Sequence, residues 1–294
     1  MAVSEDVRAY YAGFAEREWT RLERAADGEI EFVVTCAALE RYLPPSGRVL
    51  DVGGGPGRYT LWLAERGYRV TLADLSPALL AIAQQRIGSA SPEVGERVEA
   101  IVEADARDLS AWTAGAFDAV LCLGPFYHLP APSDQAQVAA ELRRVLAPGG
   151  VVFAALMPRL AFVRRSLSLP DERRHLLEPD FLERVLDEGV FLNDVPGRFT
   201  QGAGVEPSAV GPFFAGCGFE SLALLSAESL TVGLESELPA LLGDPALAPL
   251  VRQLAVEHAV DPSLLGLARH LLYVGRRRWL VAGGSRRRTA AGGR

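Results

Sequence analysis

Residues 49–60 read VLDVGGGPGRYT, a short apolar run that leads into a turn containing four glycines. Glycine adopts positive φ angles without strain and has no side chain, so a ligand can lie directly against such a turn. A helical stretch follows, and a helix N-terminus presents free N–H groups to a polar or anionic ligand. These residues therefore predict a strand, a ligand-contacting turn and a helix, in that order.

Other nucleotide-binding proteins also use glycine-rich turns, with different spacings. A dinucleotide site requires G-x-G-x-x-G, and counting from Gly53 the third glycine position holds Arg58. A phosphate-binding P-loop requires Lys-Ser/Thr after the glycines, and this sequence has none there. Both classes are disfavoured, while a purely structural glycine turn stays open on this stretch alone.

Short apolar runs alternate with helical stretches on both sides of the turn. This alternation predicts an α/β fold with a doubly wound, mainly parallel, seven-stranded sheet of the Rossmann-like kind. The connection between the last two strands permits an antiparallel edge. The predicted strands are residues 48–52, 69–73, 98–103, 117–122, 151–155, 220–225 and 271–276. The predicted helices between them are 57–66, 77–87, 134–146 and 207–215.

Further segments lie outside this alternating pattern. An amphipathic helix is predicted over 4–25 and a second helix over 29–42, so that residues 1–45 form a helical cap. Two inserts, 157–206 and 226–270, exceed what the sheet needs and are expected to form a lid or the substrate side. The second is expected to be helical around 247–259. Residues 1–282 are predicted to form one domain, followed by a disordered basic tail over 283–294.

Composition and charge indicate which kinds of partner to expect: nucleic acid, membrane or metal. Seven of the 30 basic residues, all arginines, lie in 276–294, so the formal net charge of −7 becomes −14 for residues 1–275. Such an acidic body makes a nucleic-acid partner improbable. No apolar run is long enough to cross a membrane, and the N-terminus lacks the pattern of a signal peptide, so a cytoplasmic location is expected. The three cysteines and four histidines show no metal-ligand spacing, and no metal is expected.

Two acidic residues follow the next two predicted strands. Asp74 ends the second strand in LADLSP, and Asp105 follows the third in EADARDL. The segment DVGGGPGRYT resembles the first motif of class I S-adenosylmethionine (SAM)-dependent methyltransferases. The two acidic residues and the segment LRRVLAPGGVVF at 142–153 complete the match to this family. The resemblance is good over 48–156 and weak over 217–225 and 271–276. The N-terminal helix and both inserts lie outside it.

The resemblance implies a role for each landmark in binding SAM. Asp51 would lie near the methionyl amino group, and the turn glycines would accommodate the amino acid and the ribose. Asp74 would accept both ribose hydroxyls, although a helix-capping role beside Ser76 is compatible with the same position. Asp105 would meet the adenine amino group and Ala106 would offer its backbone to the ring. The implied cofactor residues are Asp51, Gly53, Gly55, Gly57, Asp74, Leu75, Asp105, Ala106 and Leu123.

The fourth strand ends in LGPFYHL at 123–129, at the edge where open α/β sheets bind ligands. The Asn/Asp-Pro-Pro-Tyr/Phe motif of amino-group methyltransferases is missing, and the segment resembles the LGPxYHL variant of small-molecule methyltransferases. His128 is the candidate general base because its reference pKa lies near 6.5, with packing behind the cofactor as the alternative. Tyr127 is a candidate for orienting the substrate or for core packing.

Aromatic and basic residues outside the sheet give two further hypotheses. Tyr10, Tyr11 and Trp19 form an N-terminal lid in one interpretation and ordinary helix packing in the other. Basic residues of the first insert recognise an acidic substrate or are simply solvated. These basic residues are Arg164, Arg165, Arg173, Arg174 and His175.

The predicted function is methyl transfer from SAM to a small-molecule acceptor. Three alternatives remain: a SAM-binding module without catalysis, a nucleic-acid methyltransferase and a nicotinamide-dependent oxidoreductase. The sequence carries no signal for the acceptor atom or for the oligomeric state.

Overall fold

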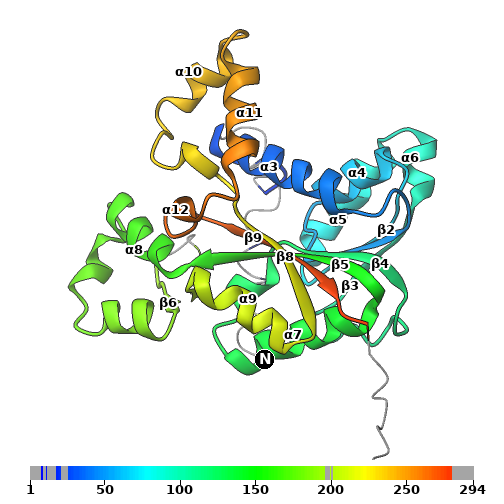
Figure 1. The fold of residues 1–294 in the computed structure, drawn as a ribbon, viewed down its shortest axis with the longest axis horizontal. Helices are drawn as coiled ribbons and strands as arrows, with labels where there is room; N and C mark the ends of the chain where they lie inside the picture. The colour runs from blue at the N-terminus through cyan, green and yellow to red at the C-terminus, as the bar shows by residue number, and fades with distance from the viewer. Residues whose placement is uncertain are drawn as a thin grey trace, which may run out of the picture.

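The computed structural model describes residues 8, 11, 18–20, 26–195, 199 and 201–279 of the 294-residue chain. A twisted sheet runs through the centre, with helices on both of its faces and two helical projections at one end (Figure 1). Residues 8, 11 and 18–20 are helical, in agreement with the predicted N-terminal helix, of which the other residues lie outside the described set. The predicted tail over 283–294 also lies outside it.

Seven strands make up the sheet that the sequence predicts. Their order is β3-β2-β1-β4-β5-β9-β8, with the first five parallel and β9 antiparallel to both of its neighbours. The prediction of a mainly parallel, Rossmann-like sheet with an antiparallel edge is confirmed. The strands are β1 (Arg48–Val52), β2 (Arg69–Asp74), β3 (Val98–Glu103), β4 (Phe117–Cys122), β5 (Leu146–Pro158), β8 (Phe219–Ser226) and β9 (Leu271–Arg277).

Two further strands extend the sheet where the sequence predicted only an insert. β5 continues to Pro158 and there pairs with β7 (Gln201–Val205), which pairs antiparallel with β6 (Val190–Leu192). The sequence QGAGV has little β propensity, and its glycines are needed for close packing instead. A Cβ atom on Gly202 would lie 2.4 Å from the Phe162 ring, and one on Gly204 would lie 3.0 Å from the backbone of Arg159.

Helices cover the two faces of the sheet as a doubly wound fold requires. On one face lie α3 (Ala26–Tyr42), α4 (Arg58–Glu65), α5 (Pro77–Gly88), α6 (Pro92–Arg97) and α11 (Ala248–His258). On the other lie α7 (Pro132–Val145) and α9 (Pro207–Gly216). The predicted helices are confirmed, and their ends differ only slightly from the observed ones.

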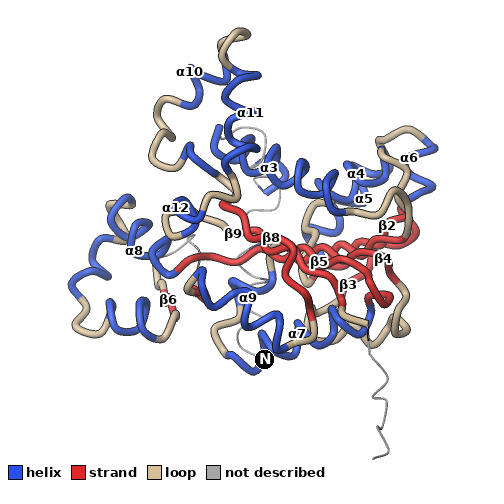
Figure 2. Tube along the Cα trace, in the orientation of Figure 1, coloured by secondary structure: helices blue, strands red, loops and turns tan. Residues whose placement is uncertain are grey.

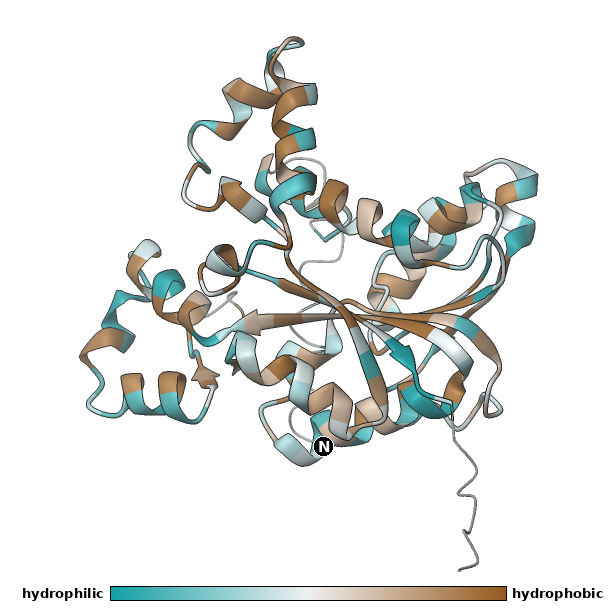
Figure 3. Cartoon of the chain, viewed as in Figure 1, coloured by the Kyte–Doolittle hydropathy of each residue, from teal (hydrophilic) through white to brown (hydrophobic). Residues whose placement is uncertain are grey.

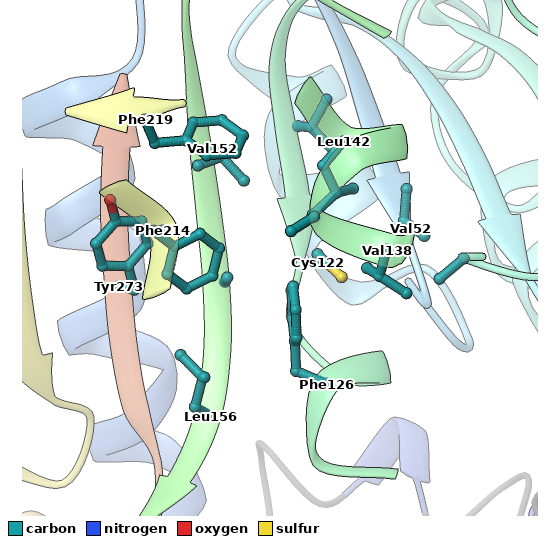
Figure 4. Close-up of a cluster of buried hydrophobic side chains, with 14 of the residues drawn as sticks. Val52, Cys122, Phe126, Val138, Leu142, Val152, Leu156, Phe214, Phe219 and Tyr273 are labelled. Atoms are coloured by element: carbon teal, nitrogen blue, oxygen red, sulfur yellow. The ribbon is translucent and has the colours of Figure 1, made fainter. Parts of the chain in front are cut away.

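Alternate residues of each strand face the two hydrophobic cores. In β1, Leu50 and Val52 belong to the core beneath α7 and α9, whereas Val49 belongs to the core beneath α3 and α4. Figure 4 shows Val52 and Phe214 among the side chains of the first core. The hydrophobic residues lie mainly along the strands and the inner faces of the helices (Figure 3). Asp51 faces α4 because it alternates with Leu50 and Val52.

The inserts form the two projections beyond the sheet (Figure 2). The first contains α8 (Arg159–Ser168), the 3-10 helix η2 (Arg173–Leu177), the π-helix η3 (Glu183–Asp187) and strands β6 and β7. The second contains η4 (Ser229–Thr231), α10 (Leu238–Gly243), α11 and α12 (Pro262–Leu265). The first has its own core of Phe162, Phe181, Val185 and Phe191. None of the helices among the described residues is long and apolar enough to span a bilayer.

The ring of Phe214 gives a test of how α9 is attached to the sheet. It is fully buried and stacks on Tyr273 of β9, with ring centroids 4.0 Å apart and planes 7° from parallel. Replacing it by alanine leaves a large cavity, so we expect Phe214→Ala to lower the free energy of unfolding by about 3–5 kcal/mol in urea titrations followed by circular dichroism. Leu250→Ala, at a half-exposed position, should change it by no more than about 0.5 kcal/mol. Equal effects of the two substitutions would contradict this packing.

Candidate functional site

A cleft of about 1090 Å³ lies at the carboxyl ends of β1 to β4. The turns that follow these strands bring together residues that are far apart in the sequence. The predicted residues that line the cleft are Asp51, Gly53, Gly55, Asp74, Leu75, Asp105, Ala106, Leu123, Tyr127 and His128.

The glycine turn leaves no room for side chains. Gly53, Gly55 and Gly57 have φ angles of 68°, 55° and 85°. A Cβ atom on Gly53 would lie 2.7 Å from the Pro125 ring, and one on Gly54 would lie 2.6 Å from the Asp51 carboxylate. Gly57 begins α4 behind the wall of the cleft and faces Ala83 of α5. Its expected contact with a cofactor stays a prediction, whereas Gly54 was overlooked although it stands between two predicted residues.

Asp51 is buried in the floor of the cleft. Its Oδ2 accepts a hydrogen bond of 2.7 Å from the Thr60 hydroxyl, and within the described part of the chain its buried Oδ1 has no partner. Burial raises the pKa of this carboxyl to about 7, while the hydrogen bond from Thr60 lowers it and the nearby Asp74 raises it. A buried acceptor atom that faces a cleft without a partner suits a cationic donor from a ligand.

Asp74 is held by backbone amides. Its Oδ2 accepts from the N–H of Gly55 and its Oδ1 from the N–H of Ser76, both at 2.8 Å. Burial raises the pKa of Asp74, and these two hydrogen bonds oppose the rise. A carboxylate oxygen accepts more than one hydrogen bond, so both oxygens can still accept from a ligand. Ser76 also caps α5, so the capping interpretation and the ligand interpretation are compatible.

The third acid, Asp105, lies at the side of the cleft. The Arg107 guanidinium meets its carboxylate at 2.6 Å and also reaches Asp134 of α7 at 2.9 Å. Arg107 itself lines the cleft, and Ala106 between them is buried. The ion pairs fix the direction of the Asp105 carboxylate.

His128 and Tyr127 lie on the short helix η1 (Pro125–His128), directly after β4. The Tyr127 hydroxyl donates to the Leu123 carbonyl at 3.1 Å, and His128 Nε2 lies 2.9 Å from the Tyr11 hydroxyl. Burial lowers the pKa of His128 to about 3. The imidazole is therefore neutral at physiological pH and only weakly basic, which favours a packing role over proton removal.

Residues of the N-terminal segment close one side of the cleft. Arg8, Tyr11 and Glu18 line it, and Arg8 also pairs with Glu103 at the end of β3, at 2.6 Å. Trp19 does not line the cleft, and the guanidinium groups of Arg58 and Arg86 lie over its ring. Tyr10 lies outside the described residues, so only Tyr11 of the three predicted lid aromatics is seen at the cleft.

A second cavity of about 1770 Å³ adjoins the first. Tyr11, Glu18 and Tyr127 line both. Its other walls come from α3, from α8 in the first insert and from the loops on either side of the second insert. The residues of these walls that carry charge or can titrate are Asp27, Glu31, Arg164, Arg165, Glu228, Glu235, Arg269 and His270.

The basic residues of the first insert separate into two groups. Arg164 and Arg165 reach the second cavity, and Arg165 pairs there with the buried Glu172 at 2.5 Å. The other three line neither cavity. Arg173 donates to the Leu167 carbonyl, Arg174 pairs with Asp194, and His175 is buried between Glu178 and Asn193.

Some residues of the site gave little or no signal in the sequence. Thr60 belongs to the glycine motif itself and could have been chosen as a hydrogen-bonding residue in the first turn of α4. Glu228 lies near the start of the second insert and His270 is its last residue, directly before β9. No sequence motif links these two residues. Their proximity depends on the path of the insert, which returns the chain to the same point.

Comparisons with known proteins agree with this geometry. The methyltransferase domain family matches residues 49–150. The chain is similar to the ubiquinone biosynthesis O-methyltransferase of Xanthomonas axonopodis pv. citri (strain 306), with 36% identity over 119 residues, which are 40% of this chain and 46% of the relative. It spans about half the length of the curated relatives it matches.

Solved structures extend the likeness to most of the fold. A SAM-dependent methyltransferase of Methanosarcina mazei has a TM-score of 0.56 at 17% identity, with 82% of this chain and 97% of that chain covered. The 1,6-didemethyltoxoflavin-N1-methyltransferase of Burkholderia thailandensis, solved with S-adenosylhomocysteine, has a TM-score of 0.54 at 18% identity, with 95% and 88% covered. At these identities the likeness concerns the fold.

The walls of the first cleft fit SAM. The partnerless Oδ1 of Asp51 suits a methionyl amino group, and the two oriented oxygens of Asp74 suit a pair of ribose hydroxyls. The turn around Gly53 and Gly54 packs closely against Pro125, Leu72 and Asp51, so its bare backbone lines the cleft, where a ligand can lie against it. With the match to residues 49–150, this fit identifies those residues as a class I SAM-dependent methyltransferase domain.

Proposed function

We propose that this protein transfers a methyl group from SAM to a small-molecule acceptor. The observation that carries the proposal is the contact between the two cavities, which share Tyr11 and Glu18 of the N-terminal segment and Tyr127, which follows β4. Bound SAM supplies an electrophilic methyl group on a sulfonium. The protein's part is to hold the acceptor against that group and to exclude water.

The residues of the cleft have separate tasks in this proposal. Asp51 and Asp74 fix the amino acid and the ribose, and Asp105 with Ala106 hold the base. Tyr127 stands at the junction of the cavities and orients the acceptor. His128 supports Tyr11 across the opening, because the two side chains are joined by a hydrogen bond and their rings meet edge to face at 5.6 Å.

The alternatives fit the site less well. A dinucleotide needs a glycine where Arg58 stands, and the guanidinium there is packed over the Phe32 ring. A nucleic acid would meet a second cavity lined by several carboxylates. A SAM-binding module without catalysis does not require a second cavity of this size beside the cofactor cleft.

Calorimetry with S-adenosylhomocysteine tests the cofactor site directly. Asp74→Asn removes one acceptor oxygen and loosens the amides of Gly55 and Ser76, so we expect at least tenfold weaker binding, or about 1.4 kcal/mol. Asp108→Asn is the matched control, because this exposed aspartate lies outside the cleft, and its affinity should equal that of the wild type. Absence of binding by the wild-type protein would overturn the proposed function.

The raised pKa of Asp51 predicts a proton linked to binding. Near neutral pH part of the Asp51 carboxyls are therefore protonated, and a cationic amino group placed beside them favours the charged form. Binding should therefore release a proton, increasingly as the pH falls from 8.5 to 6. Calorimetry in buffers of different ionisation enthalpy measures this release.

Two substitutions test whether the proton released on binding comes from Asp51 and not from the ligand. Asp51→Asn should abolish this component of the release and weaken binding. Thr60→Val removes a hydrogen bond that favours the carboxylate, so the release should persist to higher pH than in the wild type. Identical release in the wild type and in Asp51→Asn would show that Asp51 does not contact the amino group.

A further inference from the structure

We propose that His270, oriented by Glu228, is the catalytic base of this protein and that the acceptor is an amine. The inference rests on the proposed function, since it concerns the second cavity beside the SAM cleft. It also replaces the candidate base His128, whose buried imidazole is weakly basic. Four observations carry it: the hydrogen bonds around His270, its position, the charges of the cavity and its aromatic wall.

Glu228 is a buried carboxylate whose oxygens are fixed by its neighbours. Its Oε2 accepts from the backbone N–H groups of Arg269 and His270, at 2.9 and 3.2 Å. Its Oε1 lies 3.0 Å from His270 Nδ1, and a carboxylate oxygen of Glu31 lies 3.6 Å from the same nitrogen. Since carboxylates only accept, Nδ1 carries a proton and in the neutral ring the lone pair is on Nε2.

A single side chain, that of Tyr127, separates His270 from the end of β4. It precedes β9 and lines the second cavity, and its ring centroid lies 5.7 Å from that of Tyr127. Tyr127 in turn lines both cavities and donates to the carbonyl of Leu123, which lines the SAM cleft. An acceptor bound against Tyr127 is therefore close both to His270 and to the end of β4.

The charges of the second cavity favour a cationic acceptor. Among the described residues, five carboxylates line it, from Glu18, Asp27, Glu31, Glu228 and Glu235, against three arginines. One of the arginines, Arg269, is already paired with Asp27 and Glu235. A second, Arg165, is paired with Glu172. This balance stabilises an ammonium group and opposes formation of a phenolate or a carboxylate.

Three aromatic rings stand among these carboxylates. They belong to Tyr11, Tyr127 and Phe199, and all line the second cavity. Aromatic faces attract ammonium groups, most strongly in sites from which water is excluded. A wall that combines aromatic rings with carboxylates has the chemistry that recognises an amine in its protonated form.

An amine acceptor bound as its ammonium needs a base before it can react. His270 Nε2 takes one proton from the ammonium, and the freed electron pair on nitrogen forms the bond to the methyl carbon. The carbon–sulfur bond breaks with its electrons on sulfur, so the sulfonium becomes a neutral thioether. Glu228 holds the imidazolium that results, as a carboxylate does for a catalytic histidine.

The protonation of His270 can be measured without an acceptor. In protein labelled with ¹⁵N-histidine and saturated with S-adenosylhomocysteine, we expect the neutral His270 ring in the Nδ1–H tautomer. Glu228→Gln should shift the ring toward the other tautomer and lower its pKa, because a charged acceptor becomes a neutral amide. Glu31→Gln, whose distance is longer, should have the smaller effect. An Nε2–H tautomer in the wild type would overturn the proposal.

Several neighbouring groups influence the pKa of His270 that this titration measures. Glu228 and Glu31 face the ring from η4 and α3, and Tyr127 faces it from η1. Arg269, the preceding residue, is held by Asp27 and Glu235. The variants of the two glutamates are therefore compared at the same ionic strength and with Arg269 intact.

Turnover of labelled SAM on benzylamine, phenethylamine, phenol and benzoate tests the acceptor class. We expect methylation of the amines, and a loss of at least about 100-fold in kcat for His270→Gln, with unchanged affinity for S-adenosylhomocysteine. Raising the pH should restore part of this loss, because the amine then sheds its proton to water. His258→Gln, at an exposed histidine of α11, is the matched control and should leave kcat unchanged.

The outcomes separate the base from the proposed function. Loss of S-adenosylhomocysteine binding by the wild type would defeat the proposed function itself. Intact binding with preferential methylation of phenol, or with no amine methylated, would overturn the acceptor class. Unchanged kcat in His270→Gln, or activity lost with a chelator and restored by a divalent cation, would overturn the role of His270 as base.

Discussion

The hydrogen bond from the Gly55 amide to the Asp74 carboxylate, at 2.8 Å, joins the ends of β1 and β2. The amides of Gly53 and Gly54 bond to the Ala73 carbonyl beside it, so the glycine turn is fastened to the second strand at three points. This fastening places two buried acids, Asp51 and Asp74, at one cleft. Burying carboxylates costs free energy unless something compensates, and here only part of the hydrogen-bonding capacity is used inside the protein. The unused part is what a polar ligand meets.

The position of the second cavity depends on where β9 enters the sheet. Because β9 pairs antiparallel with β5, it begins at the edge where β1 to β4 end, and His270 immediately precedes it. The second insert leaves the sheet after β8 and returns at the same place, which brings Glu228 beside His270. The cofactor cleft and the second cavity are thus built by different parts of the chain. The two cavities meet at Tyr127, which lies on η1 just after β4 and lines both of them.

The sheet and the group of predicted residues at the first cleft were predictable because their signals are local. Apolar runs of strand length, with glycine or an acid at the end, predicted the seven strands, and all of the predicted cofactor residues except Gly57 line the cleft. The β6–β7 pair was missed because QGAGV is selected for close packing against Phe162 and Arg159, and not for strand propensity. The sequence left open whether His128 acts as a base or packs behind the cofactor, because its burial depends on residues of distant segments such as Tyr11 and Phe199.

The sequence by itself determined the fold class and the methyl donor. The spacing from Asp51 through the glycines to Asp74 and Asp105 is set by strand and turn lengths, which are properties of short segments. Only the tertiary structure decided which groups line the second cavity. Glu228 and His270 stand 42 residues apart, and their 3.0 Å contact follows from the fold of an insert that has no motif. The lining of the second cavity depends on such non-local proximity, which no local pattern of residues encodes.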